Sequence, residues 1–275
     1  MPAHLVVADS ITKLPAPGFD KVVVAGSHAG VYAAALAAAE HPRGVVLNDA
    51  GIGLDEAGVS GLAWLDDLGC PACAVSADSA RIGWGSDMLE RGVLSRVNAA
   101  AARLGCRPGQ PCGEAVALLA AAPAWTGTVP TQHEARTLLC DGPIRVIGLD
   151  SNSLVAPEDA DAIVITGSHG GLLGGRPETA IATKTAGAVY HDAGGGLDGA
   201  GMSRLPALDA RGVPGATVAA ATARIGDARS VWTTGRLSAV NELAHRLGVK
   251  VGQTPRDLVD AIVRSRASTP CARAR

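Results

Sequence analysis

The sequence predicts an α/β fold made of two tandem homologous repeats, each a mostly parallel sheet flanked by helices, with a pseudo-two-fold axis relating them. Two observations lead to this expectation. Short β-branched runs alternate with alanine-rich segments of helical period, which is typical of parallel strands joined by helices. The chain also repeats itself, because Asp9 and His28 with their neighbours recur as Asp150 and His169 at a constant offset of 141 residues.

The repeat continues downstream at an offset of 143 residues, after two extra residues in the second copy. The stretch NDAGIGLDEAGVSGLAWLDDLG at 48–69 aligns with HDAGGGLDGAGMSRLPALDARG at 191–212, and 91–105 aligns with 234–248. Two diverged copies reveal which polar residues a shared scaffold has kept twice. These pairs are Asp9/Asp150, Ser27/Ser168, His28/His169, Asp49/Asp192, Asp55/Asp198, Arg81/Arg224, Ser95/Ser238 and Asn98/Asn241.

The elements follow in order along each copy. In the first copy, apolar runs predict strands at 4–9, 21–26, 44–49 and 73–77, and helical periodicity predicts helices at 30–41, 95–105 and 113–122. In the second copy the matching strands are 144–150, 162–167, 187–192 and 216–221, and a helix at 255–265 closes the repeat.

These matches divide the chain into repeat 1 at 1–122, a linker at 123–143, repeat 2 at 144–266 and a flexible tail at 267–275. The linker stretch has no counterpart in the second copy. Its proline, glycine and threonine content is typical of a connecting segment.

The composition is that of a globular protein, with 47% hydrophobic and 18% charged residues. The net charge is −2 and no cluster of lysine and arginine is interleaved with aromatic residues, so nucleic acid is not an expected partner. Polar residues or glycine interrupt every apolar run before about 18 residues, so we expect no membrane contact and a cytoplasmic location. The expected partner is a small anionic substrate, and a homo-oligomer is compatible with the sequence.

Cys70 and Cys73 have the CxxC spacing of a redox pair or of half a zinc site. Redox pairs of this kind lie where a strand turns into a helix, whereas this pair precedes an apolar run. No second CxxC follows, and Cys106 and Cys112 have unsuitable spacing. We therefore expect ordinary core cysteines.

Polar residues kept in both copies lie where predicted strands end. His28, Asp49 and Arg81 each follow a different strand, and the carboxyl ends of parallel strands share the edge at which open α/β folds bind ligands. The same placement holds for His169, Asp192 and Arg224. We therefore expect the candidate site at this edge, with His28 within reach of Asp49 or Arg81.

The loop around each histidine ends in a glycine, Gly30 or Gly171, and offers backbone N–H groups that could hold an anion. It matches neither the G-x-G-x-x-G pattern nor the P-loop pattern. We therefore expect no nucleotide and no other cofactor.

A histidine in this position can act as a general acid or base, because its ordinary pKa is near 6.5. Asp49 and Asp192 are expected to orient His28 and His169. A single histidine would more often cap a helix or bind a buried carbonyl, but the recurrence favours catalysis.

Ser27 and Ser168 are candidate nucleophiles, and a helix-capping role is the alternative. Each would need a base from elsewhere, because neighbouring residues of a strand point to opposite faces. Asp55 and Asp198 follow glycine-rich turns and are expected to be helix N-caps.

Arg81 and Arg224 could hold a carboxylate or phosphate through the planar guanidinium, or form salt bridges with the aspartates at the strand ends. Asn98 and Asn241 are expected on a helical face, where they either reach the ligand or hold the copies together. His191 replaces Asn48 and adds a substrate-binding group on one side only.

A divalent metal held by the paired histidines and aspartates is a rival interpretation. The chain has no HExxH or other tight ligand spacing, so we expect no metal.

Three functions fit these features. The leading expectation is a hydrolase of a small anionic or amide-bearing metabolite, with histidine as general acid and base and arginine as anion clamp. The second is a racemase or isomerase in which two histidines face each other as bases. The third is a small-ligand-binding module without chemistry, since a fold alone does not imply catalysis.

Overall fold

A computed structural model describes residues 4–267 and contains two mixed sheets flanked by helices. The first sheet has the order β1-β2-β3-β4-β5, with strands β1 (Leu5–Ala8), β2 (Val22–His28), β3 (Gly44–Asn48), β4 (Ala72–Val75) and β5 (Leu94–Val97). Strands β1 to β4 are parallel and β5 is antiparallel to β4. The mostly parallel sheet expected from the alternating pattern is therefore present in the N-terminal half.

The second sheet has the order β11-β10-β9-β8-β7-β6. Its strands are β6 (Arg136–Cys140), β7 (Val146–Leu149), β8 (Ile163–His169), β9 (Gly187–His191), β10 (Gly215–Val218) and β11 (Leu237–Val240). The strands from β7 to β10 are parallel, and both edge strands are antiparallel to their neighbours. The two sheets are consistent with two repeats.

Helices cover both faces of the first sheet. Alternate residues of β2 to β4 pack against α1 (Val31–Ala39) and α2 (Ser60–Asp67) on one face. The intervening residues pack against α3 (Gly85–Arg91), α4 (Ala99–Arg103) and α5 (Cys112–Leu119) on the other. Six of the nine residues of α1 are alanine, and small side chains of this kind let a helix pack closely on a sheet in a core short of aromatic residues.

The second sheet is covered by α6 (Arg204–Ala210) on one face and by α7 (Ala228–Thr234), α8 (Glu242–Arg246) and α9 (Pro255–Ala267) on the other. Where the first half has α1, the second half has two short 3-10 turns, Leu173–Gly175 and Pro177–Thr179. Further 3-10 turns are Ile11–Lys13, Leu54–Glu56, Asn152–Leu154, Pro157–Asp159 and Leu197–Met202. Glycines and a proline after β8 therefore replace a helix by an irregular segment.

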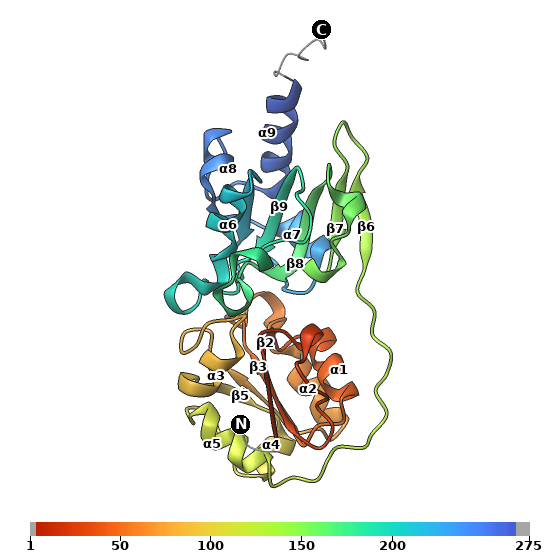
Figure 1. Ribbon diagram of the computed structural model, residues 1–275, viewed down its shortest axis with the longest axis vertical. Helices are drawn as coiled ribbons and strands as arrows, with labels where there is room; N and C mark the ends of the chain where they lie inside the picture. Colours follow the sequence, from red (N-terminus) through yellow and green to blue (C-terminus); the bar gives the residue numbers. More distant parts are fainter. Residues whose placement is uncertain (1–3, 268–275) are drawn as a thin grey trace.

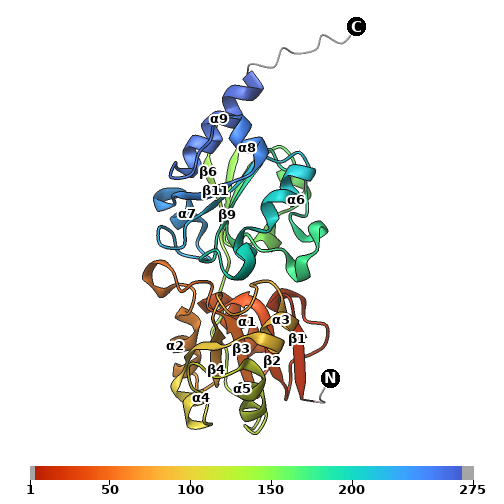
Figure 2. The same cartoon turned by 90° about the vertical axis from the view of Figure 1, so that its left-hand side faces the viewer.

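The two halves are stacked so that the loops after the parallel strands of one half meet those of the other (Figures 1 and 2). Ala50, Ile82, Ala193, Ala200 and Ile225 form a buried apolar cluster at this junction. Backbone bonds also cross it in both directions: the N–H of Leu54 donates to Ala220 at 2.8 Å, and the N–H of Leu197 donates to Ala77 at 2.8 Å.

Two details differ from the sequence-based expectation. Residues 95–97, expected at the start of a helix, belong to strand β5, which pairs with β4, and helix α4 begins only after its N-cap Asn98. Residues 136–140, assigned to the linker, form β6, which extends the second sheet beside β7. The preceding connection runs along the outside of the molecule (Figure 1).

The expected tail at 267–275 begins at the last residue of α9, and 268–275 lie outside the described residues. Within residues 4–267, none of the helices has both the length and the apolarity needed to cross a bilayer.

Candidate functional site

A cavity of about 240 Å³ lies between the two halves, and both halves line it. Its polar lining comes from the ends of β2 and β8, from the turns after β1 and β7, and from the segment before β6. Helices α1 and α6 add Tyr32 and Arg204. The other polar side chains of the lining include Ser10, Thr12, Ser27, His28, Glu134, Ser151, Ser153, Ser168 and His169. The two serine–histidine loops, 141 residues apart, thus contribute to one cavity.

His28 and His169 are the last residues of β2 and β8. The backbone N–H of Gly30 donates to Nδ1 of His28 at 3.1 Å, and that of Gly171 donates to Nδ1 of His169 at 3.2 Å. An imidazole that accepts at Nδ1 carries its proton at Nε2 when neutral. Both rings are therefore held as the same tautomer, with Nε2–H as the donor.

Burial keeps both rings neutral. It lowers the pKa of His28 from 6.5 to about 4, with a smaller contribution from His191. Burial is also the main cause that holds the pKa of His169 well below its ordinary value, followed by the positive charge of Arg204. At neutral pH the cavity contains two uncharged imidazole donors, an arrangement suited to polarising a carbonyl oxygen.

Each imidazole packs against a glycine of the opposite half. A Cβ on Gly226 would lie 3.4 Å from Cε1 of His28, and a Cβ on Gly83 would lie 3.2 Å from Cε1 of His169. Both glycines have a left-handed backbone, with φ of +80° and +78°. Only glycine takes this conformation without strain and leaves room for the ring.

Ser27 and Ser168 do not form hydrogen-bonded pairs with the histidines. The Oγ of Ser27 accepts from the N–H of Ile11 at 3.0 Å, and the Oγ of Ser168 accepts from the N–H of Asn152 at 2.8 Å. Neither serine caps a helix, since Gly30 occupies the N-cap of α1. Their hydroxyls instead hold the turns that follow β1 and β7 against the cavity.

Those turns add hydroxyl groups to the lining. Ser10 and Thr12 lie 2.9 Å apart through their hydroxyl oxygens, and Ser151 and Ser153 lie 2.7 Å apart. Asp9 and Asp150, just before these turns, accept from the first turns of α3 and α7 through the N–H groups of Gly85 and Ala228.

Glu134 is a site residue that the sequence analysis missed, because it belongs to the unrepeated connecting segment. Its pKa is raised chiefly by burial and also by the charge of Asp150, while hydrogen bonds with Ser151 and Tyr32 act in the opposite direction. The pKa of Tyr32 is raised in turn, by burial first and then by Glu134. The cavity therefore contains a carboxyl group with increased proton affinity.

Arg204 is the second missed residue. It is buried at the start of α6, its Nη1 donates to the carbonyls of Thr179 and Ala180, and its guanidinium lies over the Tyr190 ring at 5.2 Å. Its Nε has no hydrogen-bond partner. Gly61 occupies the matching place of the first copy, so the signal available in the sequence was an arginine opposite a glycine.

Asp49 and Asp192 do not orient the histidines. The Oδ1 of Asp49 accepts from the N–H groups of Gly51 and Ala77, both at 2.9 Å. Asp192 accepts from Gly194 and Ala220 in the matching way. These aspartates tie together two loops of their own half, and the expected contact between His28 and Asp49 is replaced by the bond from Gly30.

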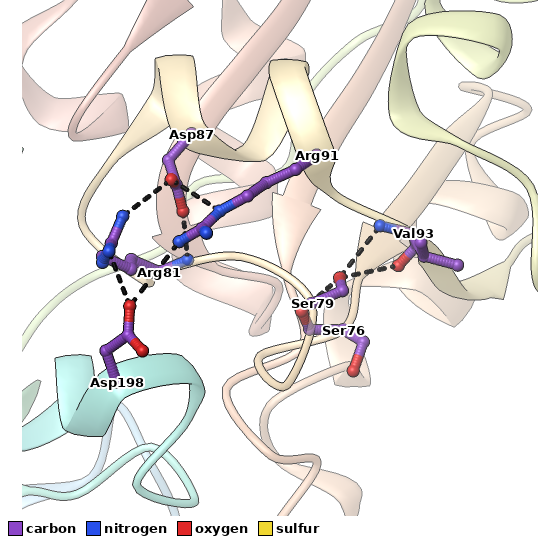
Figure 3. Close-up of polar contacts among 7 residues, drawn as sticks. All are labelled: Ser76, Ser79, Arg81, Asp87, Arg91, Val93 and Asp198. Atoms are coloured by element: carbon purple, nitrogen blue, oxygen red, sulfur yellow. Dashed lines mark hydrogen bonds and ion pairs between the residues drawn. The ribbon is translucent and has the colours of Figure 1, made fainter.

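Arg81 and Arg224 join the halves by ion pairs and do not line the cavity. Arg81 contacts Asp87 through Nη1 at 2.9 Å and Asp198 of the other half through Nη2 at 2.6 Å (Figure 3). Arg224 contacts Asp55 of the other half at 2.7 Å. Both arginines therefore form salt bridges, but with Asp55 and Asp198 and not with the aspartates at the strand ends. Asp55 and Asp198 have φ of 54° and are not N-caps.

Asn98 and Asn241 are N-caps of α4 and α8 and lie away from the cavity. Each side chain also bridges the start of the neighbouring strand, so the expected role in ligand binding is replaced by a structural one. His191 is buried, with Nδ1 accepting from Ala193 and Nε2 3.0 Å from the carbonyl of Ala223. It contacts backbone groups and does not line the cavity.

Cys70 and Cys73 are buried thiols, and burial raises the pKa of Cys70 to about 12. Among residues 4–267, no group of three or more His, Cys, Asp or Glu side chains is arranged to hold a metal ion.

No protein-family model, curated protein or solved structure matches the chain.

Proposed function

We propose that the protein is a hydrolase of a small anionic or amide-bearing metabolite, with one active site shared by the two halves. The observation that carries this proposal is that both serine–histidine loops line one cavity together with Glu134 and Arg204. Reciprocal contacts across the junction, such as Arg81 with Asp198 and Arg224 with Asp55, support a gene duplication and a pseudo-two-fold axis through the site.

The proposed chemistry uses the two imidazoles as donors. Nε2–H of His28 and of His169 hydrogen-bond the carbonyl oxygen of the substrate and stabilise the negative charge that develops on it. A neutral imidazole can supply this stabilisation without losing a proton.

Glu134 is the proposed general base. Its carboxylate takes a proton from a water molecule as the hydroxyl oxygen bonds to the carbonyl carbon, and the same proton then passes to the leaving nitrogen as the carbon–nitrogen bond breaks. The products are a carboxylic acid and an amine, so atoms and charges balance. The raised pKa of Glu134 suits this role, because a carboxylate with increased proton affinity is a stronger base than an ordinary one.

The test begins with a search for ligands by thermal shift across small amides, lactams and carboxylates, followed by mass spectrometry for conversion. We expect Glu134→Gln to abolish turnover while ligand binding and folding remain. Glu178→Gln is the matched control, since Glu178 also lines the cavity but is exposed and contacts Arg176. Bound compounds that are never converted would instead identify a binding module.

A racemase or isomerase is the second candidate, because two matched imidazoles line the same cavity. Such an enzyme needs a free ring nitrogen as base, whereas each Nδ1 here accepts from backbone and each Nε2 carries the proton. Incubation of bound ligands in deuterium oxide separates the two proposals. Deuterium entering a carbon next to a carbonyl, without hydrolysis, would favour the isomerase.

A further inference from the structure

Arg204 is a buried cation without a carboxylate partner. Its side chain is nearly inaccessible, with 3% relative exposure for the residue. Among residues 4–267, no Asp or Glu oxygen lies within ion-pair distance of its guanidinium. The arginines that do form ion pairs are Arg43, Arg81, Arg91, Arg136, Arg176 and Arg224. Its polar contacts are two backbone carbonyls and the face of the Tyr190 ring.

A charge buried in this way is costly unless an anion compensates it. The carbonyls of Thr179 and Ala180 satisfy Nη1 in part but bring no negative charge, and Nε remains unpartnered. Burial lowers the pKa of Arg204, but an arginine stays protonated at neutral pH. The missing counter-charge must therefore come from outside the described chain.

The other charged groups of the cavity do not supply it. Glu134 is associated with Tyr32 and Ser151, and Glu178 is exposed beside Arg176. The place matching Arg204 in the first half is Gly61, and the lysine of the lining, Lys13, is exposed to solvent, so Arg204 is the buried cation among the described lining residues. The positive charge of Arg204 also lowers the pKa of His169, so this cation acts on the histidine of its own half.

We infer that Arg204 binds a single carboxylate group of the ligand and thereby fixes one orientation in a cavity whose Ser-His loops are otherwise matched. The planar guanidinium suits a carboxylate, and one buried cation is neutralised by one negative charge. The uncharged part of the ligand then extends past the imidazoles toward Glu134. This inference names the substrate class of the proposed hydrolase and rests on that function only for the reaction.

The test compares acetate, its uncharged analogue acetamide, and inorganic phosphate as probes of the intact protein at pH 7, by calorimetry and thermal shift. We expect acetate to bind and to raise the melting temperature, and acetamide and phosphate to bind more weakly. Arg204→Met should weaken acetate binding by about thirtyfold or more, as expected when one member of a buried charge pair is removed. Arg176→Met is the matched control, since Arg176 is exposed and interacts with Asp9 and Glu178, and it should leave acetate binding unchanged.

Equal binding of acetate and acetamide by the unchanged protein would overturn the inference, even if Arg204→Met did not fold. Tighter binding of phosphate than of acetate would overturn the carboxylate assignment. Acetate binding that survives in a folded Arg204→Met variant would also refute it. If binding depends on Arg204 but no amide that carries a carboxylate group is ever hydrolysed, the inference stands and the proposed hydrolase fails.

Discussion

Acidification should destabilise the protein through the imidazole of His28. In the unfolded chain this group takes up a proton near pH 6.5, whereas in the folded chain its pKa is about 4. Between these values the unfolded state binds more protons, so the free energy of unfolding falls as the pH falls. The contribution is complete above pH 6.5 and is lost on the way to pH 4.

The magnitude follows from the two pKa values. A pKa of about 4 in place of 6.5 corresponds to about 3 kcal/mol, at about 1.4 kcal/mol for each tenfold change in proton affinity. His169 and His191 also have lowered pKa values, so the whole protein should lose more than this amount. A variant is needed to isolate the share of His28.

His28→Asn is the appropriate change, because its side-chain oxygen can accept from the N–H of Gly30 in place of Nδ1. Urea unfolding should be measured for both proteins at several values between pH 7 and pH 4. We expect the loss of unfolding free energy across this interval to be about 3 kcal/mol smaller in the variant. Equal losses in the two proteins, or an NMR titration that gives His28 a pKa near 6.5, would refute the reasoning.

Four further substitutions test other parts of the structure. Asn98→Ala removes an acceptor from two buried N–H groups and a donor from two carbonyls, so urea unfolding should show a loss of about 3 kcal/mol, and Asn241→Ala a similar loss; ligand affinity that falls without loss of stability would contradict the structural role. Asp198→Asn breaks the exposed ion pair with Arg81, leaves the pair of Arg81 with Asp87 in place, and should cost less than about 1 kcal/mol in low salt and nothing at high salt; a salt-independent loss of several times that size would show that the pair matters for another reason. Gly226→Ala should cost about 1–2 kcal/mol through its left-handed backbone, and since the added Cβ would lie 3.4 Å from Cε1 of His28, a crystal structure should show the ring in place; a displaced ring would contradict this contact.

Hydrophobic periodicity was enough to predict the parallel strands, because their residues are buried on both faces and form continuous apolar runs. It failed at the edges of the sheets. Leu94–Val97 is a four-residue strand with one fully buried residue, and it is followed directly by an alanine-rich helix with Asn98 as its N-cap, so the sequence carries too few residues of strand period to separate the two elements. Arg136–Cys140 is exposed on alternate residues and lies in a segment with no second copy for comparison.

The repeat singled out two Ser-His loops, and both line one cavity, because loops after parallel strands converge at the same edge of a sheet. The same comparison gave the wrong partners for Asp49 and Arg81. Their polar groups bind backbone and opposite-half carboxylates, and sequence spacing carries no information about such contacts. Glu134 and Arg204 were missed for a further reason: matching two copies selects what they share, and these residues occur once.

The outer connection between the halves also has a consequence for how the site is assembled. Glu134 enters the cavity from the segment that leads into the second sheet, whereas Tyr32, which influences its proton affinity, belongs to the first. The tether keeps the two bodies at a high effective concentration, so docking is an intramolecular event. Cleavage of the chain between 123 and 133 would separate it into two components, and Tyr32 and Glu134 would then meet only in the bound complex.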